Sequence, residues 1–514
     1  MKKQNIYNVL AFFAIGLISH AGIWLYKIAS TDCNSAGLFH YTPDWEVTLG
    51  RWLIPVVDGI RYYLSVPFFV GPLAVLLFAI GTTLVLNILE IESDIFRYVI
   101  GAFLMVTPCV GNTLMFYYCA DSYALSMIFA CLFVMFMKKE FSIKNFLIAV
   151  VLLIMSLGLY QAYLGVAAVL CAGVLIVEIL DGKATELEIV KKAIYMATSA
   201  LVSLLLYYGI SRIIVNTRDL SLAGYGGADN VSKTSLLDVK IAVALAYQKF
   251  VYLFWGLSQS KYHSFYRIHI YSGLVSGIFA CVFITIIITK KIYVSTFKTV
   301  ALAVLTLLMP LLCGSIMLIV KGHDIHILMC QSYFVIIAFI AAVVLRTRTT
   351  MGNIAIINGV SLGTLILIAL MGFELTAINN STYEYNHIVR NNMVSTLNRV
   401  LTQAECMEGY TEETEFAFAG RPANGYPVDS YLEKMSFLET STLYSNEYRF
   451  NIAVMDNILK EDIGCAVKIC DEDTFKQLVS SEEFKNMPKY PDNGSLKLVD
   501  DVILVKFSDE VLIP

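Results

Sequence analysis

The chain is organised around the stretch Asp32-Cys-Asn-Ser-Ala-Gly-Leu-Phe-His-Tyr-Thr-Pro-Asp44-Trp45-Glu46-Val-Thr-Leu-Gly50-Arg51-Trp52. It holds three carboxylates, one arginine and two tryptophans amid apolar sequence. Charged groups are costly next to hydrocarbon, so such a cluster beside a membrane span is a candidate functional site. The alternative is an interfacial helix anchored by Trp45 and Trp52. A plain anchor would favour lysine and arginine on its polar face, whereas this stretch begins with acids.

The composition around this stretch is that of a membrane protein. Of the 514 residues, 57% are hydrophobic and only 15% are charged, against roughly 25% charged in soluble domains. Apolar runs of about 20 residues recur from Tyr7 to Phe373 and then stop. Lys2 and Lys3 precede the first run without a small-residue cleavage site after it, which predicts a retained helix. We therefore expect an α-helical polytopic membrane protein.

The apolar runs predict eleven transmembrane helices. The run 145–180 is apolar for 36 residues; one helix of that length would be about 54 Å long, against a membrane core of roughly 30 Å. We expect two short spans there, with a bend near Gly158, Tyr160, Gln161 and Tyr163. The other spans are predicted at 7–26, 66–89, 98–116, 122–137, 193–215, 269–289, 297–320, 327–345 and 354–373.

Basic clusters set the predicted orientation. With eleven spans, all of them fall on one side, which the positive-inside rule identifies as the cytoplasm. These clusters are Lys2/Lys3, Lys138/Lys139/Lys144, Lys183/Lys191/Lys192, Lys290/Lys291 and Arg346/Arg348. We expect a cytoplasmic N-terminus, a transmembrane domain over 1–374 with outer loops 28–65 and 216–268, and an extracytoplasmic domain over 375–514.

The tail reads as a small α/β domain. From Glu374 onward there are 24 acidic and 12 basic residues, a net charge of −12, which leaves +8 for the rest. A strand is predicted at 415–420, a pair of strand fragments at 497–507 and a helix at 474–484. Three cysteines of the tail, Cys406, Cys465 and Cys470, leave room for one disulfide.

The outer carboxylates and cations suit transfer of a sugar from a lipid phosphate. A carboxylate can take the proton of an acceptor hydroxyl, and Asp44 and Glu46 are the leading candidates, with Asp32 third. A cation can hold the phosphate as it leaves; we expect Arg51 in this role, helped by Lys321 or His323. On one continuous helix, Asp44 and Arg51 would share a face and Glu46 would not.

Other chemistries lack their motifs. The sequence has no Walker loop, dinucleotide fingerprint or zinc motif. We therefore expect no cofactor, no metal and no nucleic-acid partner. Without a soluble cytoplasmic domain for a nucleotide sugar, a lipid-linked donor is favoured. Trp52, Tyr160 and Gln161 are candidate sugar contacts, although the last two could be only a polar bend between helices.

Three segments resemble the GtrII-like bacterial glucosyltransferases. They are Asp44-Trp-Glu-x-x-x-Gly50-Arg51-Trp52, Ser156-Leu-Gly-Leu-Tyr160-Gln161-Ala-Tyr, and Met487-Pro-x-Tyr490-Pro491-x-x-Gly494-Ser with Leu504-Val-Lys506 after it. The resemblance implies a GT-C-like fold and inverting transfer of glucose from polyprenyl phosphate to O-antigen or another envelope glycan, outside the inner membrane. The family's acidic residue in the first outer loop maps onto Asp44 or Glu46. Pro43 stands where GT-C enzymes often have a second acid, which leaves the identity of the base open.

Two further function classes compete with catalysis. A lipid-linked saccharide flippase or exporter needs charges deep inside its spans, whereas the predicted spans carry their charges at their ends. A scaffold with a partner-binding outer domain would leave the acidic first loop unexplained. Membrane glycosyl transfer is therefore the favoured hypothesis.

Overall fold

The computed structural model describes residues 3–39, 43–182, 184–223, 235–256, 266–318, 325–351, 355–422 and 447–514. The chain divides into two compact units. The first comprises residues 1–21 with 41–379, and the second comprises residues 22–40 with 380–514.

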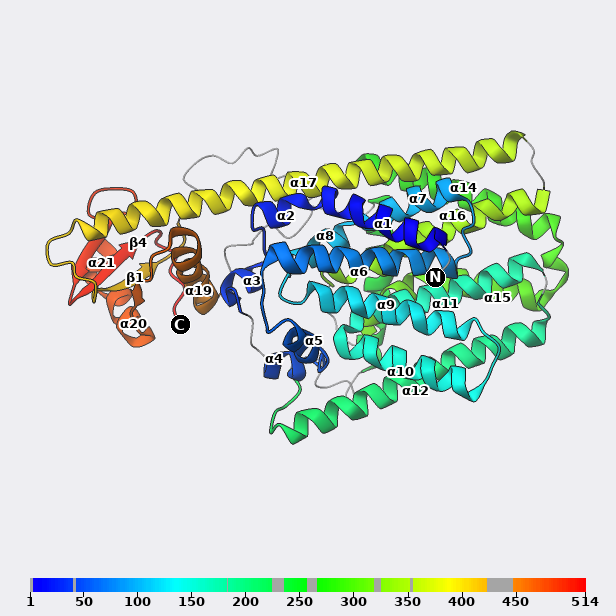
Figure 1. Cartoon of the computed structure of the whole chain (residues 1–514), viewed down its shortest axis with the longest axis horizontal. Helices are drawn as coiled ribbons and strands as arrows, with labels where there is room; N and C mark the ends of the chain where they lie inside the picture. The colour runs from blue at the N-terminus through cyan, green and yellow to red at the C-terminus, as the bar shows by residue number, and fades with distance from the viewer. Residues whose placement is uncertain are drawn as a thin grey trace. The chain divides into compact units, whose positions relative to one another are not determined.

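The first unit is a bundle of helices (Figure 1). Helix α9 packs against α6 and α10, and α11 packs against α9, α15 and α16. The longer helices are α1 (Lys3–Ser19), α6 (Pro67–Ile88), α7 (Asp94–Met105), α9 (Ala120–Met137), α10 (Ile143–Leu159), α11 (Leu164–Asp181), α12 (Glu186–Thr217), α13 (Leu236–Trp255), α14 (Tyr266–Thr289), α15 (Thr296–Cys313), α16 (Gln331–Met351) and α17 (Ala355–Glu405). The residues of α17 from Asn380 on belong to the second unit. The shorter ones are α4 (Pro43–Thr48), α5 (Ile54–Ile60) and α8 (Pro108–Met115).

Several of these helices are suited to a membrane. Among the described residues, seven are long and apolar enough to cross one, and the bent pair of α7 and α8 would be an eighth. Helices α10 and α16 are shorter apolar helices. The 43° bend between α7 and α8 lies at Thr107, which is extended because a proline follows it. The protein is thus mostly helical with several apolar helices, and the count of eleven spans stays a prediction.

The predicted break within 145–180 is confirmed. Helix α10 ends at Leu159, Tyr160 is extended with φ −159° and ψ 112°, and a short 3-10 turn over Gln161–Tyr163 leads into α11. The Ser126 hydroxyl of α9 lies 2.8 Å from the Ser156 carbonyl oxygen and 3.1 Å from that of Tyr160. The Ser126 hydroxyl thus links α9 to the chain on both sides of the break.

The second unit combines helices with a four-stranded sheet. Strand β1 (Glu415–Ala419) runs parallel to both β2 (Lys468–Ile469) and β4 (Val502–Lys506), and β3 (Leu496–Val499) is antiparallel to β4. The predicted strands are confirmed. The helix predicted at 474–484 is two helices, α20 (Glu472–Ser480) and α21 (Glu482–Asn486), because Ser481 is extended and caps the second. Cys406, Cys465 and Cys470 are free thiols.

Two features of this unit differ from the expected boundaries. Helix α17 runs without interruption from Ala355 to Glu405, past the predicted end of the last span at Phe373. Its later turns supply Leu397 and Val400 to the core around the sheet. Residues 22–40 also belong here: α3 (Thr31–Ala36) packs against α19 (Tyr448–Ile458), and the Asn34 carbonyl oxygen accepts a hydrogen bond from Asn457 at 3.0 Å. The predicted outer loop 28–65 is thus divided between the two units.

Candidate functional site

A sharp turn after α4 brings Glu46 and Arg51 together. Helix α4 ends at Thr48, and Gly50 has φ +78°, a conformation that favours glycine. The Arg51 amide donates to the Glu46 carbonyl oxygen at 2.9 Å. Arg51 Nη1 then lies 3.5 Å from Glu46 Oε2, with the two side chains only 13% and 2% exposed. The turn therefore creates a buried ion pair.

Two tyrosines cover the guanidinium of this pair. Arg51 Nη1 donates to the Tyr123 hydroxyl at 2.8 Å. The Tyr123 and Tyr160 rings are stacked, with centroids 3.8 Å apart, and the guanidinium carbon lies 5.6 Å and 5.1 Å from those centroids. Cation–π attraction of this kind strengthens where water is excluded. The start of α9 and the break after α10 thus jointly position Arg51.

Gln161 and Tyr207 hold the turn from its other side. Gln161 Nε2 donates to the Leu49 carbonyl oxygen at 2.9 Å and lies 2.7 Å from the Tyr207 hydroxyl. That hydroxyl donates to the Gly50 carbonyl oxygen at 3.2 Å. A Cβ at position 50 would collide with Tyr207 and lie 3.1 Å from Gln161 Nε2. Contacts from α12 and the helix break therefore fix the turn.

Two buried donors of the cluster have no protein acceptor among the described residues: Arg51 Nε and Trp52 Nε1. The Trp52 ring packs so closely on Gly158 that a Cβ there would lie 2.8 Å from it. Leaving a buried donor without an acceptor costs about 1–3 kcal/mol. The pair of N–H groups is therefore suited to an oxygen of an anionic ligand.

A second charged cluster lies on α5 and α9. Arg61 Nη2 donates to Asp58 Oδ1 at 2.7 Å, and Arg61 Nε donates to Asp121 Oδ2 at 3.1 Å; all three side chains are at most 5% exposed. One guanidinium thus serves two carboxylates. Burial raises the pKa of Asp58 to about 8, although the charge of Arg61 acts in the opposite direction. Asp121, in the first turn of α9, also accepts a hydrogen bond at Oδ1 from the Ser122 amide at 3.0 Å.

The three carboxylates predicted as candidate bases lie in different places relative to Arg51. Glu46 is the one beside Arg51, while Asp44 is exposed and pairs with the exposed Arg218 at 3.2 Å. The helical reason for placing Asp44 beside Arg51 is wrong, because the helix ends between them. Asp32 lies on α3, which belongs to the second unit.

Among the predicted donor-binding residues, Trp52, Tyr160 and Gln161 all lie in the cluster around Arg51. Lys321 and His323 lie outside the described residues. The prediction missed Tyr123, Tyr207, Asp58 and Arg61. The spacing of Asp58 and Arg61, three residues apart on one short helix, was the signal available for the last two.

In the described part of the chain, no group of three or more histidine, cysteine, aspartate or glutamate side chains is arranged so that it could bind a metal ion. The cluster instead offers a buried carboxylate, a guanidinium, two unpaired N–H donors and stacked aromatic rings. Such a set can bind an anion and accept a proton.

One comparison with known proteins gives a match. A protein-family model described as glucosyl transferase GtrII matches residues 32–345, more than half of the chain and the whole of the cluster around Arg51. No curated protein and no solved structure matches the chain.

Proposed function

The chain belongs to the glucosyl transferase GtrII family, and from that premise we propose that it moves glucose from polyprenyl phosphate to a cell-envelope glycan such as O-antigen. Membership implies a glucosyltransferase that acts on cell-envelope glycans. The observation that carries the finer proposal is the buried Glu46–Arg51 pair beside two N–H donors without protein acceptors. The phosphate of a lipid-linked sugar would supply anionic oxygens that accept hydrogen bonds from these donors.

In the proposed reaction, the acceptor hydroxyl oxygen attacks the anomeric carbon of glucose. The bond from that carbon to the phosphate oxygen breaks, so polyprenyl phosphate leaves and the configuration inverts. Arg51 and Trp52 donate to the leaving phosphate, which stabilises its growing charge. Glu46 takes the proton of the attacking hydroxyl. Lys321 or His323 remains a proposed additional cation at the phosphate.

Glu46 is the favoured base because it is buried beside the proposed phosphate site. Its 2% exposure excludes most water from the carboxylate, and its partner is the guanidinium expected to hold the leaving group. Asp44 has an exposed partner and is 65% exposed itself, so it would act only from the rim. Asp44 and then Asp32 are the alternative bases.

The proposed location is the outer side of the cytoplasmic membrane. The cluster takes residues from the start of α9 and from the end of α10, the ends that the positive-inside rule assigns to the outside. The donor must be available there, and a lipid-linked sugar meets that condition. We place the N-terminus in the cytoplasm and residues 375–514 outside, near the glycan acceptor.

The donor can be tested with purified protein in liposomes. We expect radiolabelled glucose to reach an O-antigen acceptor from polyprenyl-phosphate glucose and not from a nucleotide-linked glucose. Transfer from the nucleotide sugar alone would contradict the proposal. Movement of the lipid-linked sugar across the bilayer without transfer would identify an exporter instead.

Arg51→Lys tests the phosphate site. Lysine keeps the charge but loses the planar guanidinium and its several N–H donors, so we expect the KM for the lipid donor to rise about tenfold or more. Arg212→Lys is the matched control, because Arg212 is an exposed arginine of α12. Equal KM values for the two variants would remove Arg51 from donor binding.

A further inference from the structure

A second polar pocket lies at the opposite end of the bundle from the Glu46–Arg51 pair. Its volume is about 310 Å³ and its lining includes Glu90, Lys138, Glu178 and Asp181. Lys138 follows the last residue of α9, and Asp181 ends α11, whereas Tyr123 and Gln161 of the first cluster lie near the starts of the same helices. The pocket is therefore a separate site about one helix length away, roughly 27 Å for 18 residues.

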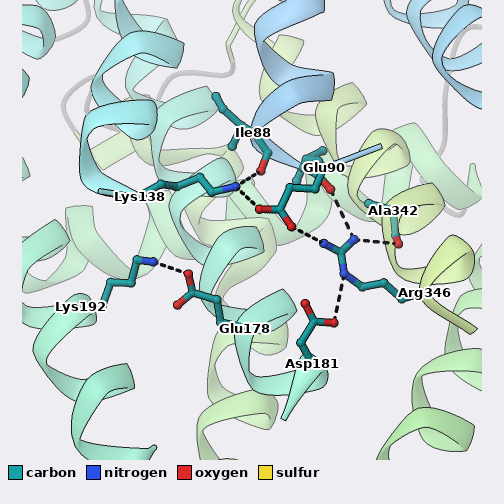
Figure 2. Close-up of polar contacts among 9 residues, drawn as sticks. Ile88, Glu90, Lys138, Glu178, Asp181, Lys192, Ala342 and Arg346 are labelled. Carbon is teal, nitrogen blue, oxygen red and sulfur yellow. Dashed lines mark hydrogen bonds and ion pairs between the residues drawn. The ribbon is translucent and has the colours of Figure 1, made fainter. Parts of the chain in front are cut away.

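Both charge signs meet in this pocket (Figure 2). Lys138 Nζ donates to Glu90 Oε1 and to the Ile88 carbonyl oxygen, at 2.7 and 2.8 Å. Arg346 of α16 reaches Glu90 Oε2 at 3.2 Å and Asp181 Oδ1 at 3.4 Å. Glu178 Oε1 pairs with Lys192. The ion pairs thus join three cations to three anions among the described residues, and Lys298 Nζ donates to the carbonyl oxygen of the lining residue Ala184 at 2.8 Å.

Some hydrogen-bonding capacity remains in this network. Figure 2 draws one contact each for the Glu178 and Asp181 carboxylates, to Lys192 and Arg346, and the hydrogen bonds of the described residues include none to their second oxygens. These carboxylates are 29% and 33% exposed. Lys138 uses two of its three N–H groups. The pocket thus offers carboxylate acceptors and an ammonium donor to one ligand.

The rest of the lining is apolar, and this selects the kind of ligand. Ile88 at the end of α6, Leu89 directly after it, and Val174 and Val177 of α11 also line the pocket. A polar end that carries both charge signs, beside apolar lining residues, matches a zwitterionic lipid at the membrane surface. We propose that the pocket binds a phospholipid whose headgroup carries a primary ammonium. The ammonium donates to Glu178 and Asp181, the phosphate accepts from Lys138, and the acyl chains follow the apolar wall.

The test is lipid retention by the full-length protein in detergent, with native mass spectrometry as the readout. The probes are phosphatidylethanolamine and phosphatidylcholine with identical chains. We expect wild-type protein to retain the ethanolamine lipid about tenfold better, because a quaternary ammonium has no N–H to donate. Equal retention would overturn the proposal. Displacement by glycerophosphoethanolamine at equal concentration would also overturn it, since a soluble compound would then suffice.

Two variants remove the site in different ways. E178Q/D181N removes the charged acceptors, and A184F introduces a bulky side chain into the lining while every charged side chain stays. Both are expected to reduce the preference for the ethanolamine lipid to within about twofold. E92Q/E140Q is the matched control, because it makes the same charge change on exposed residues outside the lining. Retention of the full preference by both test variants would show that the network only joins helices.

Discussion

At the scale of single residues, the free-energy cost of burying the Glu46–Arg51 ion pair is evidence that the pair serves ligand binding. Removing two charges from water costs several kcal/mol per ion, and their attraction offsets this only with good geometry and further hydrogen bonds. The 3.5 Å separation is long, and Arg51 Nε lacks a protein acceptor among the described residues. An apolar pair would fill this space at lower cost. A ligand that completes the hydrogen bonds gives the pair its physical rationale.

Asp58 gives a pH prediction at the same scale. Its pKa in the folded protein is about 8, above the ordinary value near 3.9. The folded state therefore binds more protons than the unfolded state between these values, and stability falls as pH rises from about 4 to 8. We expect Asp58→Asn to reduce this fall, measured as the melting temperature in detergent at pH 5 and pH 8. Asp219→Asn, at an exposed site, should keep the wild-type slope, and identical slopes for both variants would refute the assignment.

The sequence identified much of the cluster but not its geometry. Arg51, Trp52, Tyr160 and Gln161 were found because polar and aromatic residues stand out beside apolar spans. The prediction that Asp44 lies beside Arg51 is wrong. It assumes one continuous helix over both residues, whereas the chain turns at Gly50 between them. Tyr123 looked like any tyrosine of an apolar helix, and only the fold shows its hydroxyl 2.8 Å from Arg51.

At the scale of elements, the turn after α4 depends on a glycine and on two distant side chains. Gly50→Ala would place a Cβ at φ +78° against the Tyr207 hydroxyl. Strain of this kind costs about 1–3 kcal/mol. We expect a lower melting temperature and at least a tenfold loss of transfer, because the Arg51 side chain shifts with the turn. Gly209→Ala, in an open position on α12, should retain both properties; a Gly50→Ala protein as active as this control would show that the turn is dispensable.

The elements also show where patterns in the sequence mislead. The break at Tyr160 was predictable, since one helix over 145–180 exceeds the thickness of a membrane. The predicted end of the last span rests on the change to polar composition after Phe373. Between that residue and Gly409 the sequence has no glycine or proline, so nothing in the backbone ends the helix, and α17 continues to Glu405. The polar residues after Phe373 therefore indicate where the helix leaves apolar surroundings, and the helix itself continues.

At the scale of the whole molecule, the orientation in the membrane decides which donor the site can meet. We expect a reporter that replaces the chain after Phe373 to be active only if it functions outside the cytoplasm. A reporter fused after Met351 should show the opposite behaviour, because one span separates the two positions. Cytoplasmic activity after Phe373 would overturn the eleven-span arrangement and the outward location of the site.

The central claim, that Glu46 is the base of a lipid-dependent glucosyl transfer, is tested most directly by turnover. Glu46→Gln is nearly isosteric and removes the carboxylate that accepts the proton, together with the charge that faces Arg51. With saturating polyprenyl-phosphate glucose and a glycan acceptor, we predict that it lowers kcat by about 100-fold or more, with donor KM nearly unchanged. Asp44→Asn, at the exposed neighbour, should stay within about threefold of wild type. Near wild-type turnover in Glu46→Gln, together with a 100-fold loss in Asp44→Asn, would contradict the account and move the base to the rim of the site.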